Sequence, residues 1–244
     1  MTQKNRLSPQ FKPLYEQVKE LIIERIVGGI WKPGEVLPSE FQLADMLEVS
    51  QGTVRKALNT LTEENIVFRR QGVGTFVSNH TLQEMLFHFF RFKHDCGEGS
   101  ELPTANLIDI QLLDATPTIA NALELKKDTR VIQLHRVRII NDEPCIRELI
   151  YLPYHYFGDL HLESTLPHAL YNFYQNTFNI SIRNAVDSIK AVLSNAIDAE
   201  LLEVEENQPL LEVARIATAL DGRRVEYSIS RAHSANMHYE VKIT

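Results

Sequence analysis

The chain has 244 residues, a formal net charge of −7 and two cysteines, Cys96 and Cys145. This length has room for one large or two modest domains. Two cysteines give neither a disulfide framework nor metal-ligand spacing, and no apolar run reaches the length of a membrane span. We therefore expect a cytoplasmic protein without a leader peptide or membrane segment, and without a bound metal or cofactor.

The charge is divided unevenly along the chain. Residues 1–79 hold 10 Lys and Arg against 9 Asp and Glu, a balance of +1, and the remainder holds 15 against 23, a balance of −8. A small positive excess is enough for DNA binding if it is concentrated on one face, while an acidic remainder limits non-specific contact with nucleic acid. The charge therefore permits DNA binding without requiring it.

The first 65 residues predict three helices. An apolar stripe at helical spacing ends at Gly28-Gly29 and consists of Leu14, Val18, Leu21, Ile22 and Ile26. Ser39 and Gln42 form a capping box for a second helix over about residues 40–47. Glu48-Val49 then turns the chain, and Ser50 caps a third helix that runs to about residue 65. We expect a buried set between the helices made of Ala44, Leu47, Val54, Leu58 and Leu61.

The start of the third helix carries polar side chains on its outer face. They are Gln51, Thr53, Arg55 and Lys56. In a helix-turn-helix, side chains at this position reach base edges in the major groove. Arg55 can pair with guanine through two hydrogen bonds and Gln51 can pair with adenine in the same way. The alternative is that these are ordinary solvated surface groups.

A short basic hairpin follows the third helix. Arg69, Arg70 and Gln71 lead into Gly72-Val-Gly74, and Thr75 leads out. Glycine permits the positive φ of a tight hairpin tip and lets the backbone approach a phosphate. A helix-turn-helix followed by such a wing is the arrangement that places one helix in a DNA major groove.

These motifs resemble the winged helix-turn-helix of the GntR transcription regulators. The matching phrases are Pro33-Gly34, Leu37-Pro-Ser-Glu40, Leu43-Ala44, Val49-Ser50, Gly52-Thr-Val-Arg55 and Gly72-Val-Gly-Thr-Phe76. The resemblance implies a DNA-binding domain over residues 1–79. Phe41 and Gln51 stand where the family usually has arginines, so the usual operator core is not assumed. The predicted DNA-binding residues are Ser39, Ser50, Gln51, Thr53, Arg55, Lys56, Arg69, Arg70, Gln71, Gly72, Gly74 and Thr75.

The second part of the chain alternates strand-like and helix-like stretches. Two hairpins are predicted: residues 129–140 with 144–152 around Asn141-Asp142, and residues 210–219 with 225–234 around Asp221-Gly222. A further strand is expected at 106–113, helices at 118–123, 166–176 and 196–202, and either a strand or a helix at 185–194. Hairpins with helices on one side indicate an α+β domain around an antiparallel sheet.

Polar residues share faces of the predicted hairpins. Arg136 and Arg138 lie two apart on one strand and therefore point the same way. Two guanidinium groups on one face suit a phosphate or carboxylate. Glu226, Ser228 and Ser230 share a face of the last strand and could line the same cavity. The alternative is that both arginines pair with Glu148 or Glu226 across strands.

This second part resembles the effector-sensing UTRA domain of the HutC-like branch of the GntR family, whose fold is similar to that of chorismate lyase. The matching phrases are Leu134-His-Arg-Val-Arg138, Asn141-Asp-Glu-Pro144, Glu148-Leu-Ile-Tyr-Leu-Pro153 and Asp221-Gly-Arg-Arg-Val-Glu-Tyr-Ser228. The resemblance implies an effector-binding and dimerisation domain over residues 80–244. Its predicted effector residues are Arg91, Lys93, Arg136, Arg138, Glu148, His168, Tyr171, Glu226 and Ser228.

Three departures from the family bear on the ligand. Arg91-Phe-Lys93 stands where small hydroxyl residues are more usual, which indicates a more anionic ligand. Ala232 stands where sugar-phosphate sensors often have tyrosine, and His168 lies next to the usual Ser-Leu-Tyr position. Both differences argue against an aminosugar phosphate.

The sequence thus predicts a homodimeric transcription regulator, a repressor released from a palindromic DNA operator by a small anionic metabolite. One alternative is a chorismate-lyase-like enzyme, but we find no nucleophile with a neighbouring base, no cofactor fingerprint and no metal set, so we expect no enzyme activity. Another alternative is a sequence-blind DNA-packaging protein, which the acidic balance of residues 80–244 disfavours.

Overall fold

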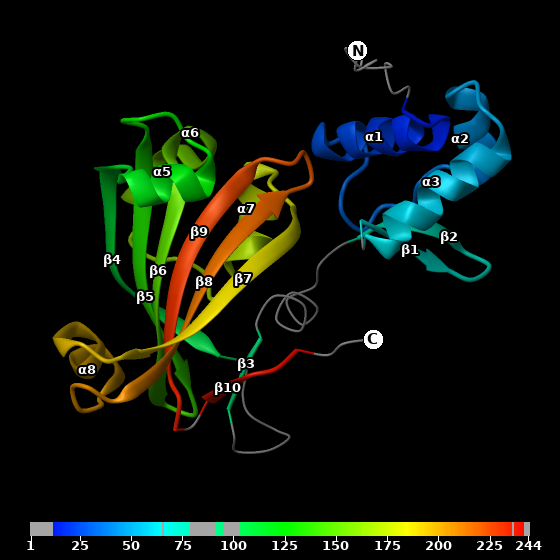
Figure 1. Ribbon diagram of the computed structural model, residues 1–244. Helices are drawn as coiled ribbons and strands as arrows, with labels where there is room; N and C mark the ends of the chain where they lie inside the picture. Colours follow the sequence, from blue (N-terminus) through cyan, green and yellow to red (C-terminus); the bar gives the residue numbers. More distant parts are fainter. Residues whose placement is uncertain (1–11, 65, 79–90, 95–102, 236, 242–244) are drawn as a thin grey trace, which may run out of the picture. The chain divides into compact units, whose positions relative to one another are not determined.

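The computed structural model describes residues 12–64, 66–78, 91–94, 103–235 and 237–241 (Figure 1). The chain divides into two compact units, residues 1–79 and 80–244. Among the described residues, no helix is both long and apolar enough to cross a membrane.

The first unit is a winged helix-turn-helix. It consists of α1 (Leu14–Val27), α2 (Glu40–Met46), α3 (Gln51–Glu63), β1 (Val67–Arg70) and β2 (Gly74–Val77). The predicted caps are present: Ser39 and Gln42 form a capping box at α2, and the Ser50 side chain accepts a hydrogen bond from the Thr53 backbone at α3. Glu48, at the turn between α2 and α3, has a positive φ of 53°.

The core of the first unit lies where the three helices meet. Val18, Ile22 and Ile26 are buried as predicted, and so are Ala44, Val54, Leu58 and Leu61. The other two members of the apolar stripe, Leu14 and Leu21, are 50% and 42% exposed. The buried line of α1 runs along every fourth residue and is widened by Ile23, which leaves Leu14 and Leu21 on its solvent side. Leu47 is half-buried.

The second unit is built on one antiparallel sheet of six strands in the order β4-β5-β6-β9-β8-β7. The strands are β4 (Thr104–Asp114), β5 (Arg130–Ile140), β6 (Glu143–Pro153), β7 (Ile182–Leu193), β8 (Pro209–Ala219) and β9 (Arg224–His233). The ambiguous segment at 185–194 is thus a strand. The β5–β6 turn is at Asn141 and Asp142 as predicted, and both have the positive φ that such two-residue hairpin turns require.

Helices lie on both faces of this sheet, which corrects the expectation that they lie on one side. On one face, Ile132, Leu134 and Leu152 of the sheet pack in a core with α6 (Tyr154–Phe157), η1 (Gly158–Leu162) and α7 (Leu170–Phe178). On the other face, Val131 and Tyr151 pack against α5 (Pro117–Leu123). The same face carries α8 (Ala196–Leu202), whose Asp198 pairs with Arg147 of β6. Apolar residues on both faces of the central strands explain why both are covered.

A small two-stranded ribbon lies at one end of the sheet. It pairs β3 (Phe92–His94) with β10 (Met237–Tyr239), and the sequence analysis expected neither strand. Phe92 and Met237 are buried in a cluster with Ile146, Val213 and Ala232. Through this cluster the ribbon packs on the face of the sheet that also carries α7, and β3 thereby reaches a pocket on that face.

Candidate functional site

The predicted DNA-binding residues form an accessible surface in the first unit. Ten of the twelve are exposed, and the other two, Thr53 and Thr75, are half-buried. The hydroxyls of Ser39 and Ser50 cap α2 and α3. The other exposed residues lie at the start of α3 and in the hairpin, where a DNA duplex can reach them.

A single carboxylate connects the two elements that are predicted to contact DNA, α3 and the hairpin. Glu40, the first residue of α2, pairs with Arg55 of α3 at 2.9 Å and with Arg69 of the hairpin at 3.3 Å. In the absence of DNA, Glu40 therefore holds one guanidinium from each element next to the other. Lys56 is placed differently, because its ammonium lies 3.9 Å from the centre of the Tyr15 ring.

The hairpin has the geometry of a wing. Phe68 and Phe76 are cross-strand partners with stacked rings 5.5 Å apart, and the Arg70 guanidinium lies within 5.5 Å of both ring centres. Gly72 has a φ of +75° at the tip. Gly74 has a φ of +145°, and a Cβ there would lie 3.0 Å from a Val36 methyl group. Both glycines are thus required by this hairpin.

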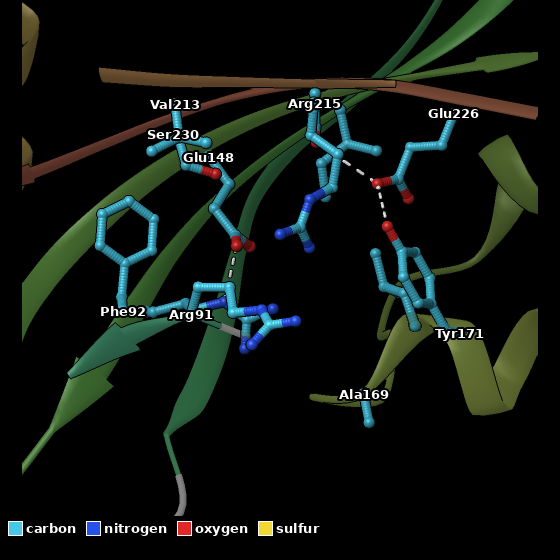
Figure 2. A pocket seen from close by; sticks show the side chains of 13 residues that line it. Arg91, Phe92, Glu148, Ala169, Tyr171, Val213, Arg215, Glu226 and Ser230 are labelled. Carbon is cyan, nitrogen blue, oxygen red and sulfur yellow. Dashed lines mark hydrogen bonds and ion pairs between the residues drawn. The ribbon is translucent and has the colours of Figure 1, made fainter. Parts of the chain in front are cut away.

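The second unit contains a pocket between the sheet, α7 and the β3 ribbon (Figure 2). The cavity volume is about 90 Å³, which is room for several waters or one small metabolite. Its charged lining consists of Arg91, Arg138, Glu148, Arg215 and Glu226. Its hydroxyl groups belong to Tyr171, Ser228 and Ser230, and its apolar wall to Phe92, Ile150, Ala169, Leu170 and Val213.

An arginine–carboxylate pair forms one wall of the pocket. Arg138 donates from Nε to Glu148 Oε1 at 2.6 Å, and Arg136 Nε lies 3.7 Å from Glu148 Oε2. Burial alone would raise the pKa of Glu148, but Arg138 and Arg136 outweigh it and hold the pKa below its ordinary value. From the sequence, pairing with a carboxylate across strands and lining a ligand pocket were alternative roles for the arginines. Here Arg138 and Glu148 form the pair and also line the pocket.

A second carboxylate occupies the opposite wall. Glu226 accepts hydrogen bonds from Tyr171 at 3.0 Å, Tyr174 at 2.9 Å and Ser228 at 3.3 Å. Burial raises the pKa of Glu226, because the loss of water disfavours the charged carboxylate more than these hydrogen bonds stabilise it. Tyr171 and Ser228 also face the cavity, so a ligand can exchange hydrogen bonds with this group.

Six of the nine predicted effector residues line the pocket, and three do not. Lys93 follows Phe92 on β3 and lies outside the lining. Arg136 is 1% exposed and donates to the His168 backbone carbonyl at 3.0 Å, while the His168 ring accepts from the Ala105 backbone at 2.9 Å. The loop before α7 thus covers Arg136. We revise the prediction for these two residues from effector contact to positioning of that loop.

One charged residue of the lining, Arg215 of β8, was not among the predicted effector residues. Its Nε and Nη2 donate to the two oxygens of Asp187 on β7 at 2.6 and 2.7 Å. Arg215 shares a strand face with Val213 and Ala217, and an arginine within an otherwise apolar strand face was the available signal. In Figure 2 it points into the middle of the pocket.

A winged helix-turn-helix joined to an α+β unit with a polar pocket defines a class of protein, the ligand-responsive transcription regulators. Comparison with known families agrees. The family described as bacterial regulatory proteins, gntR family, matches residues 14–77, and the UTRA domain matches residues 99–238. The chain therefore belongs to the GntR family and has the HutC-like combination of domains.

Individual relatives are similar along most of their length. The chain is 30% identical to the HTH-type transcriptional repressor NagR of Bacillus subtilis, covering 93% of this chain and 92% of the relative. It is 28% identical to the histidine utilization repressor of Pseudomonas aeruginosa, covering 83% and 80%. The ligand-binding domain of a GntR-family regulator from Bordetella bronchiseptica is 26% identical, with a TM-score of 0.60 over 63% of this chain and 96% of that domain. These relatives are regulators, so the chain is a DNA-binding transcription regulator. The alternative of a chorismate-lyase-like enzyme is not supported.

Proposed function

We propose that this regulator is a cytoplasmic homodimeric repressor that binds a palindromic operator through α3 and the wing, and that a small anionic metabolite in the pocket of the second unit releases it. The observation that carries the ligand class is the lining itself. Arg91, Arg138 and Arg215 place three guanidinium groups around one small cavity, and such groups bind carboxylate and phosphate with matched pairs of hydrogen bonds.

The DNA part of the proposal is supported by the exposed face of the first unit. Arg55 can read a base edge, while Arg69, Arg70 and the glycine backbone of the wing can contact phosphates. One recognition helix reads only a few base pairs, so tight and selective binding needs two copies on a two-fold symmetric site. A protein that is monomeric by light scattering at micromolar concentration, and still binds one palindrome tightly, would contradict the dimer.

Release requires the ligand to bind one state of the protein better than another. An effector can shift the equilibrium between DNA-binding and released states only by its difference in affinity for the two. Coupling of this kind is typically about 1–3 kcal/mol, or roughly 5- to 150-fold in operator affinity.

The test combines footprinting with titration of small anions. Footprints on DNA upstream of the protein's own coding region locate the operator, and binding to that DNA is then measured against rising concentrations of small carboxylates and phosphate esters. We expect a two-fold symmetric footprint that is lost as one class of anion is added, while a neutral analogue of the same size leaves it in place. A footprint that no anion changes would contradict an anionic effector.

A further inference from the structure

Arg215 is a fixed cation in the middle of the pocket. A guanidinium has five N–H groups on a rigid plane, and Asp187 accepts two of them from one edge of Arg215. Asp187 is itself held by a hydrogen bond from Tyr239 of β10. Because Asp187 holds one edge of the guanidinium, the part of Arg215 that lines the cavity is held in one orientation.

Among the residues that the structure describes, the charges around the cavity do not balance. Four guanidinium groups surround it: Arg91, Arg138 and Arg215 in the lining and Arg136 behind Glu148. Three carboxyl groups face them, namely Glu148 and Glu226 in the lining and Asp187 behind Arg215. Positive charge therefore remains in excess even with every carboxyl ionised. Arg91 also acts on Asp187 electrostatically, so this one carboxylate faces two guanidinium groups.

Charged and polar groups lie on two sides of the pocket, with Arg215 between them. In Figure 2, Glu148 and Arg91 lie on one side of the Arg215 guanidinium, and the Tyr171–Glu226 pair lies on the other. Arg138 belongs to the first side through its 2.6 Å hydrogen bond with Glu148. Phe92, Ile150 and Val213 add apolar surface to the same cavity, which suits the hydrocarbon part of a small ligand.

We infer that the effector is a short molecule with an anionic group at each end, a dicarboxylate or a phosphorylated carboxylate, and that Arg215 binds the second anionic group. The first group is held by Arg91 and Arg138. This inference rests on the proposed effector site and narrows it, because Arg215 becomes the residue that separates ligands with two anionic groups from ligands with one.

The test uses matched pairs of probes that differ in one anionic group. Succinate, glutarate and adipate are compared with butyrate, valerate and hexanoate, and phosphoglycolate is compared with ethyl phosphate. Binding to the full-length protein is measured by calorimetry at constant ionic strength. A hydrogen bond to a charged group accounts for about a tenfold change in affinity or more, so we expect at least one probe with two anionic groups to bind about tenfold tighter than its partner with one.

The variant Arg215→Gln should reduce that ratio to near one. Arg231→Gln is the matched control, because Arg231 lies on neighbouring β9 and is also ion-paired, with Asp198 and Glu212, but lies outside the lining. It should keep the parent's preference for two anionic groups. If Arg215→Gln folds poorly, the double variant Asp187→Asn/Arg215→Gln removes both charges of the pair and allows the same comparison.

The outcomes separate this inference from the proposed function. Equal binding of both members of every pair would show that the site holds a single anionic group, and a preference for two anionic groups that survives in Arg215→Gln would show that Arg215 does not bind the second one. Either result overturns the inference and leaves the proposed anionic effector site standing. If the parent binds no anion of either kind, both the inference and the anionic effector site are contradicted.

Discussion

The ion pairs of the DNA-binding surface and those of the pocket use the same residue types in opposite surroundings. The side chains of Arg55 and Arg69 are 60% and 41% exposed, and both share Glu40. Those of Arg138 and Glu148 are only 11% and 8% exposed. Exposed pairs contribute about 0–1 kcal/mol and exchange readily, whereas a broken buried pair leaves an uncompensated charge. The first arrangement is suited to being replaced by DNA, and the second to holding a binding site in shape.

The largest effect should follow from removing the carboxylate of the buried pair. Glu148→Ala leaves Arg136 and Arg138 facing each other without their shared anion, so we expect the free energy of unfolding to fall by about 3–5 kcal/mol. Chemical denaturation measures this directly. A loss below about 1 kcal/mol would show that water or other groups solvate these arginines, and the contrast with the exposed pairs would disappear.

The next largest effect concerns the DNA surface. Arg55→Ala should weaken operator binding by about 1–3 kcal/mol and relax the preference at one base position, while Arg69→Ala should weaken binding to all sequences alike and lower the salt slope by about 1. Binding to the operator and to single-base variants at several salt concentrations distinguishes these patterns. An unchanged preferred sequence in Arg55→Ala would mean that α3 is not the reading helix.

A smaller effect is expected for Glu40, whose charge opposes the approach of a phosphate. Glu40→Gln releases Arg55 and Arg69 together, so binding to random-sequence duplex should strengthen and the ratio of operator to random binding should fall, with little change in melting temperature. Glu63→Gln is the control, because it also removes one negative charge from the first unit, but at the last residue of α3, away from Arg55 near its start. Equal effects of both variants would mean that Glu40 acts through its negative charge alone and not through its pairs with Arg55 and Arg69.

The smallest effects should appear in the pH dependence of stability. The pKa of Glu148 lies below its ordinary value of 4.5 and that of Glu226 lies above it. The contribution of Glu148 is therefore present above pH 4.5 and lost as pH falls through its folded pKa, whereas that of Glu226 is present below pH 4.5 and lost as pH rises through its folded pKa. Urea denaturation of the parent, Glu148→Gln and Glu226→Gln across this range should give differences of opposite slope. If the stability differences of the two variants changed with pH in the same direction, the opposite pKa shifts of Glu148 and Glu226 would be contradicted.

The parts of the fold that local signals specify could be predicted from sequence. Ser39 with Gln42 and Ser50 cap their helices through side chains within a few residues, and Asn141-Asp142 supplies the positive φ of its turn. Alternation along β5 and β9 likewise put Arg138, Glu226 and Ser228 on faces that meet at the pocket. Each of these inferences needs only neighbouring residues or the two-residue period of a strand.

The missed features depend on contacts between distant segments. Arg215 enters the pocket because β8 lies between β9 and β7, and no local pattern reveals that β7 supplies Asp187. Arg136 and Arg138 share a strand face, yet Arg136 donates to the backbone of His168 while Arg138 lines the pocket. The β3–β10 ribbon joins segments more than a hundred residues apart. Strand order and loop docking of this kind are properties of the folded chain.

The most direct test of the account is operator release by an anion in two variants with equally buried arginines. Arg138 and Arg147 are each 9% exposed and ion-paired, but Arg138 lines the pocket, while Arg147 pairs with Asp198 on the other face of the sheet. With melting temperatures measured alongside, Arg138→Ala should keep its operator at anion concentrations that release the parent, and Arg147→Ala should release it as the parent does. Normal release in Arg138→Ala, or equal loss of response in both variants, would contradict control of DNA binding through this pocket.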